Sequence, residues 1–209
     1  MTTAIFRFAI AILLITVPGG CAYFSSLPEI PTSTESVDPA TTVTRGGTPQ
    51  KLIGEPVSSG QALPDLQLTD RNMRPRSLGE LKGRTALLSI TPSLDTQVCE
   101  RQTHLLGEAG DAELPAEIIR ITITRDLPFA QSRFAEHTGF ENILYLSDYK
   151  SAEFGLGTGL LVDELRLLAR AVMVVDKGGI IRYLQVVPEM SHLPDMTAAF
   201  AVAREVAAE

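Results

Sequence analysis

Cysteine is scarce in this sequence, with two residues among 209, Cys21 and Cys99. They do not form a C-x-x-C pair, which argues against a disulfide reductase or isomerase. The three histidines, His104, His137 and His192, are far apart and have no cysteine or acidic partners at metal-ligand spacing. We therefore expect structural or surface roles for them, no metal site, and no Cys–His hydrolase, which needs a positioned base beside its thiol.

Clusters of basic residues are also missing. The formal net charge is -7, the pI is about 5.0, and no run of Lys and Arg is interleaved with aromatic residues. These features exclude the usual classes of nucleic-acid-binding protein. The glycine run GLGTG at residues 155–159 does not follow a predicted strand and open a helix, so it does not indicate a dinucleotide site, and we expect no cofactor.

A continuous apolar run long enough to span a membrane is absent. The main candidate, Phe8–Val17, is apolar apart from Thr16 and covers about ten residues, whereas a spanning helix needs roughly 20. With Arg7 before it and small residues after it, the run is typical of an export signal. Residues 1–20 end in VPGG, so they resemble a bacterial lipoprotein signal with Cys21 as the acylated first mature residue. A plain cleaved signal and an uncleaved anchor are the alternatives.

Residues 21–42 are rich in Ser, Thr and Pro and have no periodicity, which predicts a flexible tether between membrane and domain. The protein would then be exported and anchored by lipid, facing the periplasm or the cell exterior. Lipid on Cys21 would leave Cys99 as the only free thiol, and a solitary thiol in an exported protein suggests reactivity. Residues 43–209 are long enough for one compact domain.

Strand and helix patterns alternate through this domain. Two short strands around the Gly-rich turn near residues 46–47 predict an N-terminal β-hairpin. Further strands are predicted at residues 66–70, 85–90, 117–124, 142–146, 170–175 and 180–187, and helices at 99–109, from 128 and from 194 onward. This order predicts an α/β, thioredoxin-like fold with a central mixed sheet flanked by helices.

The position of Cys99 favours a reactive thiol. The buried strand at 85–90 ends shortly before it, and Asp95 or Thr96 is a plausible N-cap of the next helix. Cys99 then falls in the first helical turn, where unpaired N–H groups and the helix dipole favour a thiolate. A buried, inert cysteine is the alternative, because free cysteine often packs as a small apolar residue.

Three motifs occur in order around this cysteine. Pro92, Thr96 and Cys99 give P-x-x-x-T-x-x-C within SLDTQVC, followed by DLPFAQSRF at 126–134 and LLARAV at 167–172. Together they resemble the peroxiredoxins, and within them the thiol peroxidases, from about Val43 to the C-terminus.

The resemblance implies that Cys99 attacks a hydroperoxide and becomes a sulfenic acid. It implies that Thr96 bonds the peroxide and the thiolate, that Pro92 shields the thiolate, and that Arg170 is the active-site cation. It also implies a thiol reductant and a homodimer. Gln131 and Glu153, in contrast, are interpreted as solvated helix residues.

The sequence departs from the family pattern at one position. Relatives have a resolving cysteine at the end of DLPFAQSRFC, where this chain has Ala135. The resemblance therefore implies a 1-Cys enzyme that needs an external thiol, either thioredoxin-like or of low molecular weight. A peroxide sensor or binding lipoprotein without efficient turnover, and a catalytically dead scaffold, are the alternatives.

Overall fold

The structure, a computed structural model, describes residues 29–209. The predicted signal peptide at 1–20 and Cys21 lie outside the described residues. Within the described range, no helix is both long and apolar enough to cross a membrane.

A seven-stranded mixed sheet runs through the middle of the molecule, in the order β10-β9-β5-β6-β7-β3-β4. Strands β5, β6 and β7 are parallel, and β9, β10, β3 and β4 pair with their neighbours in antiparallel fashion. A second, three-stranded sheet has the order β1-β2-β8. The strands are β1 (Thr42–Arg45), β2 (Thr48–Ile53), β3 (Gln67–Asp70), β4 (Pro75–Ser77), β5 (Ala86–Ile90), β6 (Ile119–Thr124), β7 (Ile143–Ser147), β8 (Leu161–Val162), β9 (Ala171–Val175) and β10 (Ile181–Val186).

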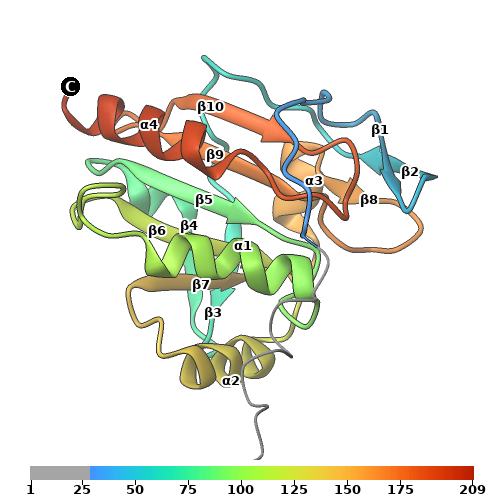
Figure 1. Ribbon diagram of the computed structural model, residues 1–209, viewed down its shortest axis with the longest axis horizontal. Helices are drawn as coiled ribbons and strands as arrows, with labels where there is room; N and C mark the ends of the chain where they lie inside the picture. Colours follow the sequence, from blue (N-terminus) through green and yellow to red (C-terminus); the bar gives the residue numbers. More distant parts are fainter. Residues whose placement is uncertain (1–28) are drawn as a thin grey trace, which may run out of the picture.

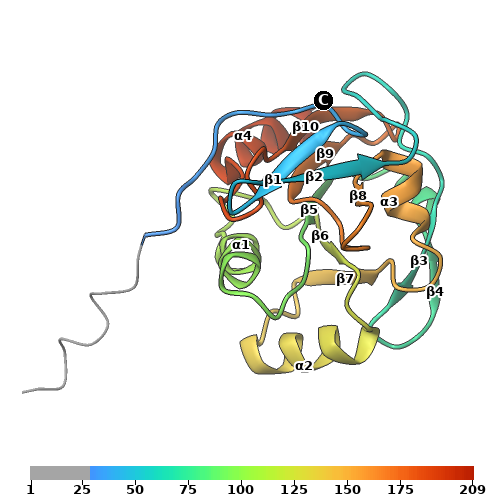
Figure 2. The ribbon, with the colours of Figure 1, turned by 90° about the vertical axis from the view of Figure 1, so that its right-hand side faces the viewer.

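Helices cover both faces of the large sheet (Figure 1). They are α1 (Gln97–Glu108), α2 (Pro128–Thr138), α3 (Glu153–Thr158) and α4 (Met196–Ala207), with a short 3-10 helix at Leu78–Leu81. In Figure 2, α1 and α4 lie on one side of β5 and β6, and α3 lies on the other. This layering explains why β5 is apolar throughout: Leu87 packs with the α1 and α4 side chains, and Leu88 packs on the opposite face. The predicted thioredoxin-like α/β fold and its N-terminal hairpin, β1 and β2, are confirmed.

The segment before the hairpin is fastened to the domain. Ser33 donates its backbone N–H to Leu193 O at 2.8 Å, and Val37 donates to Val186 O at 3.0 Å. The buried Gln185 side chain donates to Ser33 O at 2.8 Å. The tether predicted for residues 21–42 is therefore wrong for the described residues 29–42, because their backbone groups bond to the neighbouring loop and strand.

Helix α3 and strand β8 did not follow from the sequence pattern. The glycines of GLGTG belong to this region for reasons of packing. A Cβ on Gly155 would lie 2.8 Å from Leu168, and one on Gly157 would lie 2.7 Å from Leu66. Close approach of neighbouring side chains explains why positions 155 and 157 are glycine.

Candidate active site

Strand β5 and helix α1 place the thiol. β5 is buried and ends at Ile90, the chain turns through the buried Pro92, and α1 begins at Gln97 with Thr96 as its N-cap. Cys99 is the third residue of the helix, and its side chain is 0% exposed. Its predicted place in the first turn is confirmed, and the unpaired N–H groups there contribute positive potential near the sulfur.

Arg170 reaches this sulfur from the sheet. It lies just before β9, is 2% exposed, and places Nη2 3.3 Å from Cys99 Sγ. Nη1 donates to Gln102 Oε1 at 2.8 Å, and Nε donates to Met190 O, also at 2.8 Å. The structure thus unites two of the predicted site residues, although they are 71 positions apart in the chain. A guanidinium held this way can stabilise negative charge on sulfur and on a departing oxygen.

Gln102 is a site residue that the sequence analysis missed. It lies one turn after Cys99 and is 0% exposed. Its amide donates to Ser89 Oγ at 2.9 Å and to Ala171 O at 3.2 Å, while its oxygen accepts from Arg170. Gln102 therefore ties α1 to β5 and β9 and fixes one side of the guanidinium. Its spacing from the cysteine, i and i+3, is the one sequence signal that could have indicated it.

Asp126 holds the loop that leads into α1. One carboxylate oxygen accepts from Ser93 Oγ at 2.7 Å, and the other accepts from the Leu94 backbone N–H at 2.7 Å. The backbone N–H of Asp126 donates to Thr124 Oγ1 at 3.0 Å. The first residue of the DLPFAQSRF motif therefore anchors the cysteine loop to the end of β6.

Gln131 belongs to the same network, and its interpretation as a solvated residue is wrong. The side chain is fully buried, and its amide donates to Thr124 Oγ1 at 3.1 Å and to Leu146 O at 2.9 Å. Helical periodicity alone did not show that this face of α2 packs on the sheet. Glu153 is partly buried and accepts from the Gln67 backbone N–H at 2.8 Å.

Thr96 makes no hydrogen bond to the thiol in this structure. It is exposed, and its hydroxyl lies 3.5 Å from Ser93 O, without a hydrogen bond to Cys99. One turn further along α1, the buried Thr103 hydroxyl donates to the backbone carbonyl oxygen of Cys99 at 2.9 Å. Pro92 is buried within the loop between β5 and α1.

Ala135 occupies the position at which the family pattern implies a resolving cysteine. It is 0% exposed and packs in the core beneath α2 with Ile143 and Tyr145. The residue is thus an apolar core residue in this chain. Cys99 is the only cysteine in the described range and is free.

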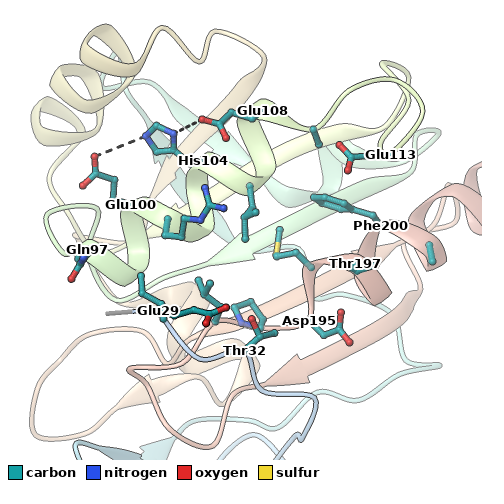
Figure 3. A pocket seen from close by; sticks show the side chains of 18 of the residues that line it. Glu29, Thr32, Gln97, Glu100, His104, Glu108, Glu113, Asp195, Thr197 and Phe200 are labelled. Carbon is teal, nitrogen blue, oxygen red and sulfur yellow. Dashed lines mark hydrogen bonds and ion pairs between the residues drawn. The ribbon is translucent and has the colours of Figure 1, made fainter. Parts of the chain in front are cut away.

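A groove of about 1100 Å³ lies between α1 and α4, but it does not contain the thiol. Figure 3 shows His104 in this groove between Glu100 and Glu108, with His104 Nδ1 2.7 Å from Glu108 Oε1. The His104 ring also packs edge-on against Phe140. The groove lines the outer face of α1, whereas Cys99 and Gln102 lie on the buried face, so the chemistry is assigned to the buried side.

A thioredoxin-like fold with one buried thiol beside a buried guanidinium defines a cysteine-based oxidoreductase. The comparisons agree with this class. The Redoxin family model matches residues 58–200. The thiol peroxidase of Staphylococcus epidermidis is 37% identical over 166 residues, which cover 79% of this chain and 99% of the relative.

Two further relatives support the assignment. The thiol peroxidase of Staphylococcus haemolyticus is 38% identical over 166 residues, again 79% of this chain and 99% of the relative. The crystal structure of a peroxiredoxin-like protein from Aquifex aeolicus matches with a TM-score of 0.74 and 31% identity, covering 81% of this chain and 99% of that one. The chain belongs to the Redoxin family, and the prediction that it is an oxidoreductase of the thiol peroxidase group is confirmed.

Proposed function

We propose that this protein reduces hydrogen peroxide and organic hydroperoxides by a 1-Cys cycle that uses an external thiol. The observation that carries the proposal is the 3.3 Å contact between Arg170 Nη2 and the buried Cys99 Sγ, combined with alanine at position 135. The contact supplies the peroxide-cleaving half of the cycle. The alanine removes the internal resolving half.

The first step oxidises the sulfur. The Cys99 thiolate attacks the terminal oxygen of the hydroperoxide, and an S–O bond forms as the O–O bond breaks. The departing hydroxide or alkoxide takes up a proton and leaves as water or alcohol. Arg170 stabilises the charge that moves from sulfur to the departing oxygen.

The second step restores the thiol. An external thiolate attacks the sulfenic sulfur, and an S–S bond forms as the S–O bond breaks; the departing hydroxide takes up a proton and leaves as water. A second external thiolate then attacks the external sulfur of this mixed disulfide, releases Cys99 as a thiolate and departs as the disulfide. We infer that the reductant is a thioredoxin-like protein or a thiol of low molecular weight. We further propose a homodimer, exported and held at a membrane through lipid on Cys21.

The test is sustained turnover. Reduced protein is mixed with excess hydrogen peroxide and either a thioredoxin system or a small thiol, and peroxide loss is followed beside the Cys99→Ser variant. Continued loss that depends on Cys99 supports the enzyme. If each reductant supports the consumption of only one equivalent of peroxide, the enzyme proposal is contradicted and a peroxide sensor is favoured. The lack of a second thiol in the site is the observation that supports a sensor. Intact mass spectrometry of the same samples reports the oxidation of Cys99 and any lipid on Cys21.

A further inference from the structure

The orientation of the Arg170 guanidinium depends on a loop outside the helices. Two of its contacts, to Cys99 and Gln102, lie on the same helix, α1. The third, from Nε to Met190 O at 2.8 Å, comes from the opposite side, in the loop that follows β10. Because a planar fork has fixed donor directions, this third contact sets how the guanidinium presents Nη2 to the sulfur.

The loop that carries Met190 is bonded to the N-terminal hairpin. Thr44 of β1 donates its backbone N–H to Pro188 O at 2.7 Å, and Met190 donates to Thr44 O at 2.8 Å. Glu189 lies between these two bonds, so the placement of Met190 O follows the placement of Glu189.

The Glu189 carboxylate joins the loop and the hairpin with five hydrogen bonds. Three of these hydrogen bonds come from the hairpin: from Thr44 Oγ1 at 2.8 Å, Gly46 N at 2.9 Å and Gly47 N at 3.0 Å. The other two come from its own loop: from Ser191 N at 3.1 Å and Ser191 Oγ at 2.8 Å. Gly46 and Gly47 have φ values of 56° and 76°, a left-handed conformation suited to glycine that turns both N–H groups toward one carboxylate.

We propose that Glu189 is a positioning residue for the peroxidase reaction: it braces the loop whose Met190 carbonyl orients Arg170 against Cys99. The N-terminal hairpin, which precedes the residues matched by the Redoxin model, thereby supports the active site. The inference rests on the proposed function insofar as Arg170 serves Cys99 in peroxide cleavage.

Glu189→Gln tests the brace because an amide keeps the size of the side chain but cannot accept all five hydrogen bonds. The matched control is Asp176→Asn. Asp176 also accepts backbone N–H groups in a turn, from Gly178 at 2.8 Å and Ile180 at 2.9 Å, but it lies at the far end of β9 from Arg170. Thermal unfolding shows whether the two substitutions destabilise the fold to a similar extent.

Two readouts report on the site. The second-order rate constant of Cys99 with hydrogen peroxide should fall about tenfold in Glu189→Gln and stay within about twofold of wild type in the control, because small displacements of reacting groups are costly. The rate of Cys99 alkylation by iodoacetamide should also fall, whereas mere opening of the fold would raise it. Equal peroxide rates in both variants, or faster alkylation in Glu189→Gln, overturn the brace.

Milder variants keep the proposal testable if Glu189→Gln does not fold. Thr44→Val and Ser191→Ala each remove a hydroxyl donor to the carboxylate, and both should lower the peroxide rate; unchanged rates in both contradict the proposal. Alkylation separates this outcome from failure of the proposed function. If the wild type does not turn over peroxide, slower alkylation in the Glu189 variant still supports the brace, and unchanged alkylation refutes it.

Discussion

Arg170→Met should separate catalysis from stability. The substitution keeps an unbranched apolar stem and removes the buried guanidinium that contacts the thiol at 3.3 Å. At an effective dielectric constant of about 20, the Coulomb energy between unit charges at that distance is about 5 kcal/mol, which sets a ceiling. Loss of one preorganised donor at developing charge typically costs about 10²- to 10³-fold in rate. We therefore expect the rate constant with peroxide to fall at least about a hundredfold.

Stability should change much less. The variant leaves two buried acceptors, Gln102 Oε1 and Met190 O, without their partner, at about 1–3 kcal/mol each. It also removes the desolvation penalty of a buried charge, which is several kcal/mol in the opposite direction. We expect the free energy of unfolding to change by less than about 2 kcal/mol. Chemical denaturation measures it.

Arg120→Met is the matched control. Arg120 is also buried, 6% exposed, and burial lowers its pKa from the ordinary value. Its guanidinium donates to Leu106 O at 3.1 Å and to Leu114 O at 2.6 Å, away from the thiol. By the same reasoning, its free energy of unfolding should change by less than about 2 kcal/mol. The control should keep the wild-type rate of sulfenic acid formation, measured by stopped flow. The role of Arg170 in peroxide cleavage would be refuted by a rate within about tenfold of wild type in Arg170→Met, or by an equal loss of rate in both variants.

Three further outcomes follow from the same contacts. Asp126→Ala should speed hydrogen exchange of the Leu94 amide by about tenfold or more, since it removes the carboxylate that accepts the hydrogen bond from this amide. Unchanged exchange would argue against the anchoring of the cysteine loop by Asp126. Ala135→Cys should lower the free energy of unfolding by about 1–3 kcal/mol through overpacking. It should also allow a peroxide-induced disulfide with Cys99, detected by intact mass. If the wild type forms a disulfide equally well, alanine at position 135 does not prevent internal resolution. Acid should weaken the brace at Glu189, as lower stability in denaturation series would show. Desolvation raises the pKa of Glu189, but its hydrogen bonds outweigh this and lower the pKa to about 2, so the stabilisation is complete above about pH 4.5 and lost as the pH falls through 2.

The sheet and most helices could be predicted from the sequence because their patterns are local. TALLSI is apolar without alternation, which is the signature of a strand covered on both faces, and it forms β5. The course of residues 29–42 could not be predicted, since their Ser, Thr and Pro content is typical of a linker and their hydrogen bonds go to residues about 150 positions away.

The residues of the candidate site also differ in whether their roles could be predicted from local sequence patterns. Cys99 and Arg170 have roles that follow from motifs. The roles of Gln102, Asp126 and Glu189 do not, although Asp126 begins a motif, because each is a polar residue of a type usually solvated. Their roles depend on partners brought together by the fold. Asp126 meets a loop 32 positions earlier, and Glu189 meets a turn 142 positions earlier. The spacing of residues within a single helix or strand gives no indication of contacts between residues so far apart in the sequence.

The charges of the site bear on how the sulfenic acid of the proposed cycle would become accessible to an external thiol. Within the described range, Arg170 has no carboxylate at ion-pair distance, and its partners other than the sulfur are neutral oxygens. A thiolate at position 99 compensates the buried cation, and a neutral sulfenic acid does not. Oxidation should therefore weaken the folded cysteine loop, because an uncompensated buried charge is costly.

The neutral variant Cys99→Ser mimics the loss of that anion. Hydrogen exchange across residues 93–99 should be faster in Cys99→Ser than in the reduced wild type, while exchange in β6 stays unchanged. Equal exchange in the two proteins would mean that the thiolate does not hold the loop closed. The external thiol would then have to reach Cys99 by a route that the charge of Arg170 does not control.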